Sequence, residues 1–185
     1  MKPSFIITTA ISFLALSCNN SSTSTAGTDT TSSAAVVAKP DPAEKNKQTA
    51  LASVEGINNH SVDQTFKDAA TDIIDYGNGD THPIKGLDSA KINLQSFLTS
   101  FPDIKGENLM AIAEGNHVAV FGEWSGTFKK EMMGMKPTGK AFKMKDVDLF
   151  TFNDQGKITE HHSVQSGEYI MMQIGTGNEK AKNKK

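Results

Sequence analysis

The chain has 185 residues and a formal net charge of −2, and this length suits one domain with tails. All 19 basic residues are lysines, so the chain lacks the planar guanidinium group that reads base edges and clamps phosphates. Because the charge is nearly balanced and no nucleic-acid-binding motif is present, we expect no nucleic-acid partner. A single cysteine allows no disulfide within one chain, so the fold must depend on its own core.

The first 17 residues have the pattern of an export signal. A lysine precedes a mostly apolar run over residues 5–16, which is too short to span a membrane, and Ser17 precedes Cys18. The run Leu-Ala-Leu-Ser-Cys resembles a bacterial lipoprotein signal, although Ala15 stands where a leucine is usual. This resemblance implies that the signal peptide is removed and that lipidated Cys18 anchors the protein in the bacterial cell envelope, on its periplasmic or outer surface. An ordinary secretory signal with a chance cysteine is the alternative.

Both ends of the mature chain have compositions that do not favour a packed core. Residues 18–42 are rich in Ser, Thr and Ala and carry little charge, which predicts a disordered, flexible stalk. Residues 177–185 hold four lysines and predict a solvated tail. The folded domain is therefore expected over residues 43–176.

Within this domain the hydrophobic pattern predicts helices first and strands afterwards. A helical stripe follows residue 43, Ser61 is placed to cap a second short helix, and a strand is expected over residues 71–76. A third helix should begin with Asp88 as its N-cap and end before Pro102. Four strands are expected at residues 109–114, 117–128, 141–152 and 157–165, and a last helix holds Tyr169, Ile170, Met172 and Ile174. This order is typical of an α+β fold with an antiparallel sheet.

Four motifs between residues 122 and 175 carry a family resemblance. They read Gly-Glu-Trp-Ser-Gly-Thr-Phe, Pro-Thr-Gly-Lys, Val-Asp-Leu-Phe-Thr-Phe-Asn-Asp-Gln-Gly-Lys-Ile-Thr-Glu-His-His and Gln-Ile-Gly. Their order and spacing resemble the SnoaL-like polyketide cyclases (ester cyclases) of the nuclear transport factor two-like superfamily. The resemblance implies a cone-shaped, cystatin-like fold, in which a curved antiparallel sheet wraps N-terminal helices around an apolar pocket. It also implies a proton-transferring carboxylate at the rim, but the position that matches the family's catalytic aspartate is Ser166.

Strand alternation selects other candidate catalytic residues. In the strand over residues 141–152, one face carries four large apolar side chains together with Asp146 and Asp148, which suggests a pocket wall. In the next strand, alternation places Glu160 and His162 on one face and His161 on the other. We therefore predict Asp148, His162 and Glu160 as catalytic, and Tyr76, Trp124, Met144, Phe150 and Ser166 as pocket residues. The alternatives are aspartates that bond the backbone and a Glu-His pair on the exposed side of the sheet.

These features predict an exported lipoprotein whose domain binds a small hydrophobic, carbonyl-type molecule. Proton transfer of the cyclase kind is one hypothesis, and a non-catalytic ligand-binding or protein-interaction module is the other. No cofactor is expected, and no metal site, because adjacent histidines on one strand point to opposite faces. The loop over residues 132–137 is rich in methionine and suggests a lid or a contact in a homodimer.

Overall fold

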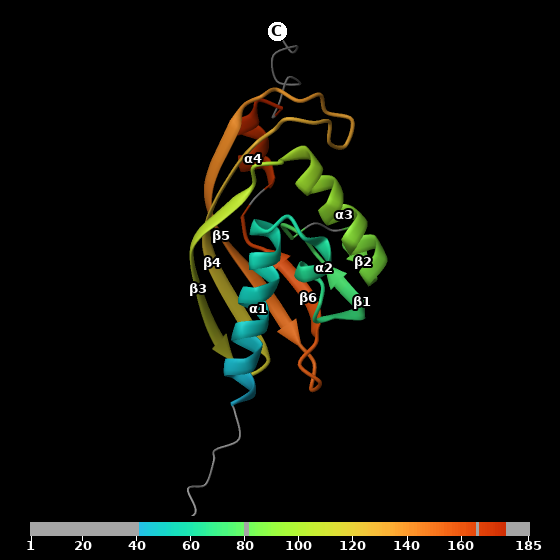
Figure 1. Cartoon of the computed structure of the whole chain (residues 1–185), viewed down its shortest axis with the longest axis vertical. Coiled ribbons are helices and arrows are strands. Elements are labelled where there is room, and N and C mark those ends of the chain that lie inside the picture. The colour runs from blue at the N-terminus through green and yellow to red at the C-terminus, as the bar shows by residue number, and fades with distance from the viewer. Residues whose placement is uncertain (1–40, 80–81, 166, 177–185) are drawn as a thin grey trace, which may run out of the picture. The chain divides into compact units, whose positions relative to one another are not determined.

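The computed structural model describes residues 41–79, 82–165 and 167–176 (Figure 1). The expected export signal with Cys18, nearly all of the expected stalk, Ser166 and the lysine-rich tail lie outside these residues. The elements, in chain order, are α1 (Pro42–Asn58), α2 (Val62–Thr65), β1 (Ala69–Asp75), β2 (Ile84–Lys85), α3 (Leu87–Ser100), β3 (Lys105–Glu114), β4 (His117–Thr127), β5 (Ala141–Phe152), β6 (Ile158–Ser163) and α4 (Gly167–Ile174). In the described part of the chain, no helix is long and apolar enough to cross a membrane.

The six strands form one curved sheet in the order β2-β1-β6-β5-β4-β3. All neighbouring strands are antiparallel except β1 and β6, which run parallel. The expected α+β class and the antiparallel run of the four long strands are therefore confirmed, and the parallel β1–β6 pair is an addition that the sequence did not predict. Parallel neighbours need a long crossover connection, and here nearly the whole domain lies between β1 and β6.

The helix starts show which local signals decide the boundaries. Asp41 caps α1 by accepting a hydrogen bond from the backbone N–H of Ala43, and Pro42 occupies the first helical turn. Ser61 caps α2 as predicted, because its hydroxyl accepts from the N–H of Gln64. The third helix begins one residue before Asp88, and its N-cap is Gly86.

Clean alternation along β4 and β5 separates an inner face from an outer one. Figure 1 shows α1 lying across the concave side of the sheet, with α2 and α3 beside it. The indole of Trp124 lies against the backbone of β3, because a Cβ atom added at Gly106 would come within 3.0 Å of the ring. The core is built from the inner face and the helices, with Ala50, Val54, Leu98, Val118, Val120, Phe142, Phe152 and Ile158 among its fully buried members. On the inner side of the sheet this packing leaves a cavity that α4 also lines.

The helix α4 is fastened to the part of β5 that β6 does not cover. The amide side chain of Gln173 accepts from the N–H of Lys143 at 3.0 Å and donates to its carbonyl oxygen at 3.1 Å. Gln165 donates to the carbonyl oxygen of Lys145 at 3.2 Å. Two glutamine side chains thus take the place of a neighbouring strand.

Candidate functional site

A cavity of about 370 Å³ lies between the sheet and the helices. Its walls are mostly apolar and come from α1, α2, α3, α4, four of the strands and the loop after β4; they include Val54, Ile57, Phe66, Ile73, Phe97, Trp124, Met132, Met144, Phe150, Ile170 and Met171. Three aspartates and one histidine interrupt this apolar lining: Asp75, Asp146, Asp148 and His161. An apolar pocket with a few convergent polar groups is the usual form of a small-molecule site.

A β-bulge brings His161 into the cavity. Phe152 pairs with Ile158, but Thr151 pairs with Glu160, so Thr159 is an extra residue in β6. One extra residue reverses the alternation, and the side chains that follow exchange faces. His161 therefore lines the cavity in the place where unbroken alternation predicts His162.

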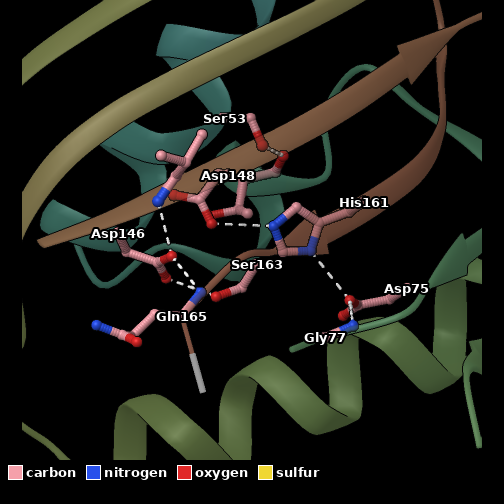
Figure 2. A network of polar contacts seen from close by, with 10 residues as sticks. Ser53, Asp75, Gly77, Asp146, Asp148, His161, Ser163 and Gln165 are labelled. Carbon is pink, nitrogen blue, oxygen red and sulfur yellow. Dashed lines mark hydrogen bonds and ion pairs between the residues drawn. The ribbon is translucent and has the colours of Figure 1, made fainter. Parts of the chain in front are cut away.

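The imidazole of His161 bridges two carboxylates (Figure 2). Its Nδ1 lies 3.0 Å from Oδ1 of Asp75, and its Nε2 lies 3.1 Å from Oδ1 of Asp148. Since both partners are acceptors, the ring can satisfy both only as an imidazolium that donates from each nitrogen. Burial by itself would lower the pKa of His161, but the hydrogen bonds and charges of the two aspartates raise it to about 10.

The two carboxyl groups differ in their surroundings. Burial raises the pKa of Asp148 above its ordinary value; its hydrogen bond with His161 opposes this effect. Burial also tends to raise the pKa of Asp75. Three interactions outweigh this effect and lower the pKa: the hydrogen bond with His161, the charge of its ring and the backbone N–H of Gly77. Asp148 is consequently the better proton acceptor of the two.

Asp148 lines the cavity, and one of its oxygens is buried without a hydrogen-bond partner. Across residues 41–79, 82–165 and 167–176, its Oδ2 is the only buried side-chain oxygen or nitrogen that lacks a hydrogen bond. Asp148 as a whole is only 8% exposed, so an unsatisfied oxygen here carries a real desolvation cost. A ligand group that donates a hydrogen bond or a proton to this atom would remove that cost.

Asp146 lines the same cavity, but its carboxylate is fully engaged in contacts within the protein. Its carboxylate accepts from the hydroxyl of Ser163 and from the backbone N–H groups of Gln165 at 2.8 Å and Val147 at 2.7 Å (Figure 2). Ser163 ends β6, Gln165 belongs to the segment that leaves it, and Val147 belongs to β5 itself. Asp146 thus fastens that segment to the sheet, which matches the alternative in which an aspartate bonds the backbone.

The sequence and fold comparisons agree with this architecture. A profile of the family described as SnoaL-like polyketide cyclase matches residues 47–174. The chain belongs to the SnoaL-like polyketide cyclase family. Among curated proteins, none matches the chain significantly.

Three solved structures show how this SnoaL-like domain compares with similar ones. AclR, a candidate hydroxylase from Streptomyces galilaeus, is 26% identical with a TM-score of 0.61, covering 72% of this chain and 87% of AclR. A candidate polyketide cyclase from Xanthomonas campestris pv. campestris is 17% identical with a TM-score of 0.66, covering 72% and 99% of the two chains. TerC, crystallised with polyporic acid, is 19% identical with a TM-score of 0.58, covering 71% and 98%. The last two likenesses concern the fold alone.

The SnoaL-like domain places some predicted site residues in its cavity and others outside it. Trp124, Met144, Phe150 and Asp148 line the cavity. His162, Glu160 and Tyr76, which were also predicted as site residues, are not among the residues that line it. The ring of His162 stacks on that of Tyr76 instead, with centroids 4.2 Å apart. Ser166 lies outside the described residues.

Two cavity residues were missed by the sequence interpretation, namely Asp75 and His161. Asp75 ends β1, and the parallel β1–β6 pairing brings it beside His161, 86 positions later in the chain. In the described ranges, no group of three or more His, Cys, Asp or Glu side chains is arranged to hold a metal ion. Asp75, His161 and Asp148 form an acid–base group in which the imidazole contacts both carboxyl groups.

Proposed function

We propose that this SnoaL-like domain binds a small, largely apolar carbonyl compound and exchanges a proton with it through Oδ2 of Asp148. The unpartnered, buried Oδ2 of a residue that lines a mostly apolar cavity is the observation that supports this proposal. The co-crystallisation of TerC with polyporic acid supports a small organic ligand for the family. Family membership supports cyclase-type chemistry, which begins with removal of a proton next to a carbonyl group.

The proposed step uses Asp148 as a general base. The C–H bond next to the carbonyl breaks, the proton moves to Oδ2, and the electron pair moves onto the carbonyl oxygen as an enolate. His161 donates to Oδ1 at 3.1 Å, which keeps that oxygen occupied and turns Oδ2 toward the ligand. Burial, by raising the pKa of Asp148, makes its carboxylate a stronger base than an exposed aspartate. Asp75 orients His161 from the other side and does not touch the ligand in this scheme.

A non-catalytic binding module is the second candidate. The observation that favours it is Ser166 at the position that matches the family's catalytic aspartate. A serine hydroxyl cannot act as a base without a partner of its own. In this case the cavity would hold the same class of ligand, and Asp148 would contribute affinity only.

Exchange of the acidic C–H protons of 1-phenyl-1,3-butanedione for deuterium tests both candidates. If the domain is a catalyst, the wild-type protein should accelerate the exchange. Asp148→Asn should then reduce this acceleration about a hundredfold or more, while its affinity for the diketone stays within a few-fold of the wild type. Asp154→Asn, in the exposed turn after β5, is the matched control and should change neither quantity. Binding without accelerated exchange would support the non-catalytic module, and absence of binding would refute both.

We also propose that the protein is exported and anchored in the bacterial cell envelope through lipidated Cys18. The support is the signal-like run that ends at this cysteine and the segment of low charge after it. Cys18→Ser should move the protein from the membrane fraction to the soluble one. A variant that still sediments with membranes would contradict the anchor.

A homodimer through the outer face of the sheet is proposed on the basis of an exposed apolar band. Ile112, Ala119 and Leu149 form one cross-strand row, and Met110 and Phe121 belong to the next. The large members, Met110, Ile112, Phe121, Leu149 and Val164, are 37% to 61% exposed. A hollow of about 450 Å³ lies beside them, lined in part by Phe121 and Val164. A contiguous apolar band of this kind favours a self-complementary contact between copies.

A further inference from the structure

The polar groups of the cavity have an excess of negative charge. Asp75, Asp146 and Asp148 contribute three carboxyl groups, and His161 contributes the single cation. No lysine occurs among the described residues that line the cavity, and the whole chain has no arginine. Even with a proton on one aspartate, the cavity wall holds more negative than positive charge.

One of these carboxyl groups has a buried oxygen that no donor satisfies. Asp146 accepts from three donors, and Asp75 accepts from Gly77 and His161. Among the buried side-chain oxygens and nitrogens of the described residues, only Oδ2 of Asp148 lacks a hydrogen-bond partner. The cavity therefore needs one donor from its ligand, at this atom, and has no cation available to pair with a ligand anion.

The aromatic part of the cavity lining favours a positively charged donor. Trp124 and Phe150 line the same cavity, and aromatic faces attract ammonium groups. A charged N–H donor to a buried carboxylate forms a stronger hydrogen bond than a neutral hydroxyl does. A ligand carboxylate would instead place two acceptors and two like charges together, at a site with low water access.

We propose that the cavity takes a further class of ligand: small apolar molecules that carry one protonated amine, held by an N–H···Oδ2 hydrogen bond to Asp148. The cavity discriminates by charge, preferring the amine to a neutral molecule of the same shape and rejecting the carboxylate. This inference rests on the proposed ligand-binding role of the cavity and names a second ligand chemistry for it. Because the amine occupies the oxygen that would accept the carbonyl compound's proton, the two ligand classes compete.

Three probes with one carbon skeleton test the preference: 2-phenylethylamine, 2-phenylethanol and phenylacetate. Calorimetry on the wild-type protein should give an affinity for the amine at least about tenfold above that for the alcohol, and no measurable binding of the acid. Asp148→Asn should remove the advantage of the amine, and Asp154→Asn should preserve it. Equal binding of amine and alcohol, stronger binding of the acid, or an amine preference unchanged in Asp148→Asn would overturn the proposal.

A competition experiment needs no variant and covers the case in which Asp148→Asn does not fold. The amine should displace 1-phenyl-1,3-butanedione from the wild-type cavity, and the displacement should persist in high salt because a buried pair is weakly screened. If the diketone binds and the amine fails to displace it, this inference fails while the proposed function stands. If neither molecule binds, the proposed function fails with it.

Discussion

Asp148 and His161 meet on the inner face of the sheet, where Oδ1 of the aspartate lies 3.1 Å from Nε2 of the histidine. The two residues belong to neighbouring strands, and the pair is almost enclosed by the cavity wall. The contact that occupies Oδ1 of Asp148 therefore also joins β5 to β6. Changes at His161 should affect stability as well as function.

We expect His161→Gln to lower the free energy of unfolding by about 3 kcal/mol at neutral pH, because it leaves two buried carboxylates without their shared cation. Urea denaturation measures this loss. His162→Gln is the matched control, since His162 only stacks on Tyr76 and should cost about 1 kcal/mol or less. Equal losses in the two variants would contradict the buried ion pair.

The stability of the domain should fall on the alkaline side. The pKa of His161 is raised to about 10 from an ordinary value of 6.5, so between these values the folded state keeps a proton that the unfolded chain has released. Stabilisation from this group is complete below the lower value and is lost as the pH rises through the upper one. Urea denaturation between about pH 7 and 9 should show this fall in the wild type and a flatter dependence in His161→Gln. Parallel curves would show that His161 does not carry the extra proton.

Gly106→Ala should destabilise the fold by about 1–3 kcal/mol, because the new methyl group would overpack the buried indole of Trp124. The added Cβ would lie 3.0 Å from two ring carbons of that side chain. Thermal or urea unfolding measures the change. Ser125→Ala, on the outer face of β4 next to Trp124, is the control and should lie within about 0.5 kcal/mol of the wild type.

Leu149→Lys should dissociate the proposed homodimer, because it places a charge in the middle of the exposed apolar band. Sedimentation velocity should show a dimer for the wild type and a monomer for the variant. Gln48→Lys adds the same side chain on the exposed side of α1 and should leave the dimer intact. A wild-type protein that sediments as a monomer at high concentration would remove the dimer from consideration.

The parts of the fold that could be predicted are those with strong local patterns. The strand over residues 141–152 has the bounds of β5, because its alternation is unbroken over its whole length. The N-cap of α2 could be predicted from the residue type of Ser61 alone. The prediction of Asp88 as the N-cap of α3 was wrong, because the N-cap is Gly86. The backbone of Gly86 has φ 86°, and a positive φ favours glycine over aspartate.

The candidate site was predicted in part, and the missed part depends on long-range pairing. Asp148 was found because it shares a face with aromatic residues of its own strand. His161 was missed because the sequence around Thr159 contains no signal that predicts a β-bulge. The extra residue moves His161 to the inner face and His162 to the outer one. Asp75 was missed because its place beside His161 arises only when β1 joins β6 in parallel.

The glutamines that cover the free edge of β5 have a consequence for the behaviour of the protein at high concentration. Backbone N–H and C=O groups on an open strand edge can pair with the same edge of another molecule, which is a common start of aggregation. Gln173 occupies both backbone groups of Lys143, and Gln165 occupies the carbonyl of Lys145. A domain that lost α4 would expose this edge beside an open apolar cavity, so we expect truncation before Gly167 to yield an insoluble product.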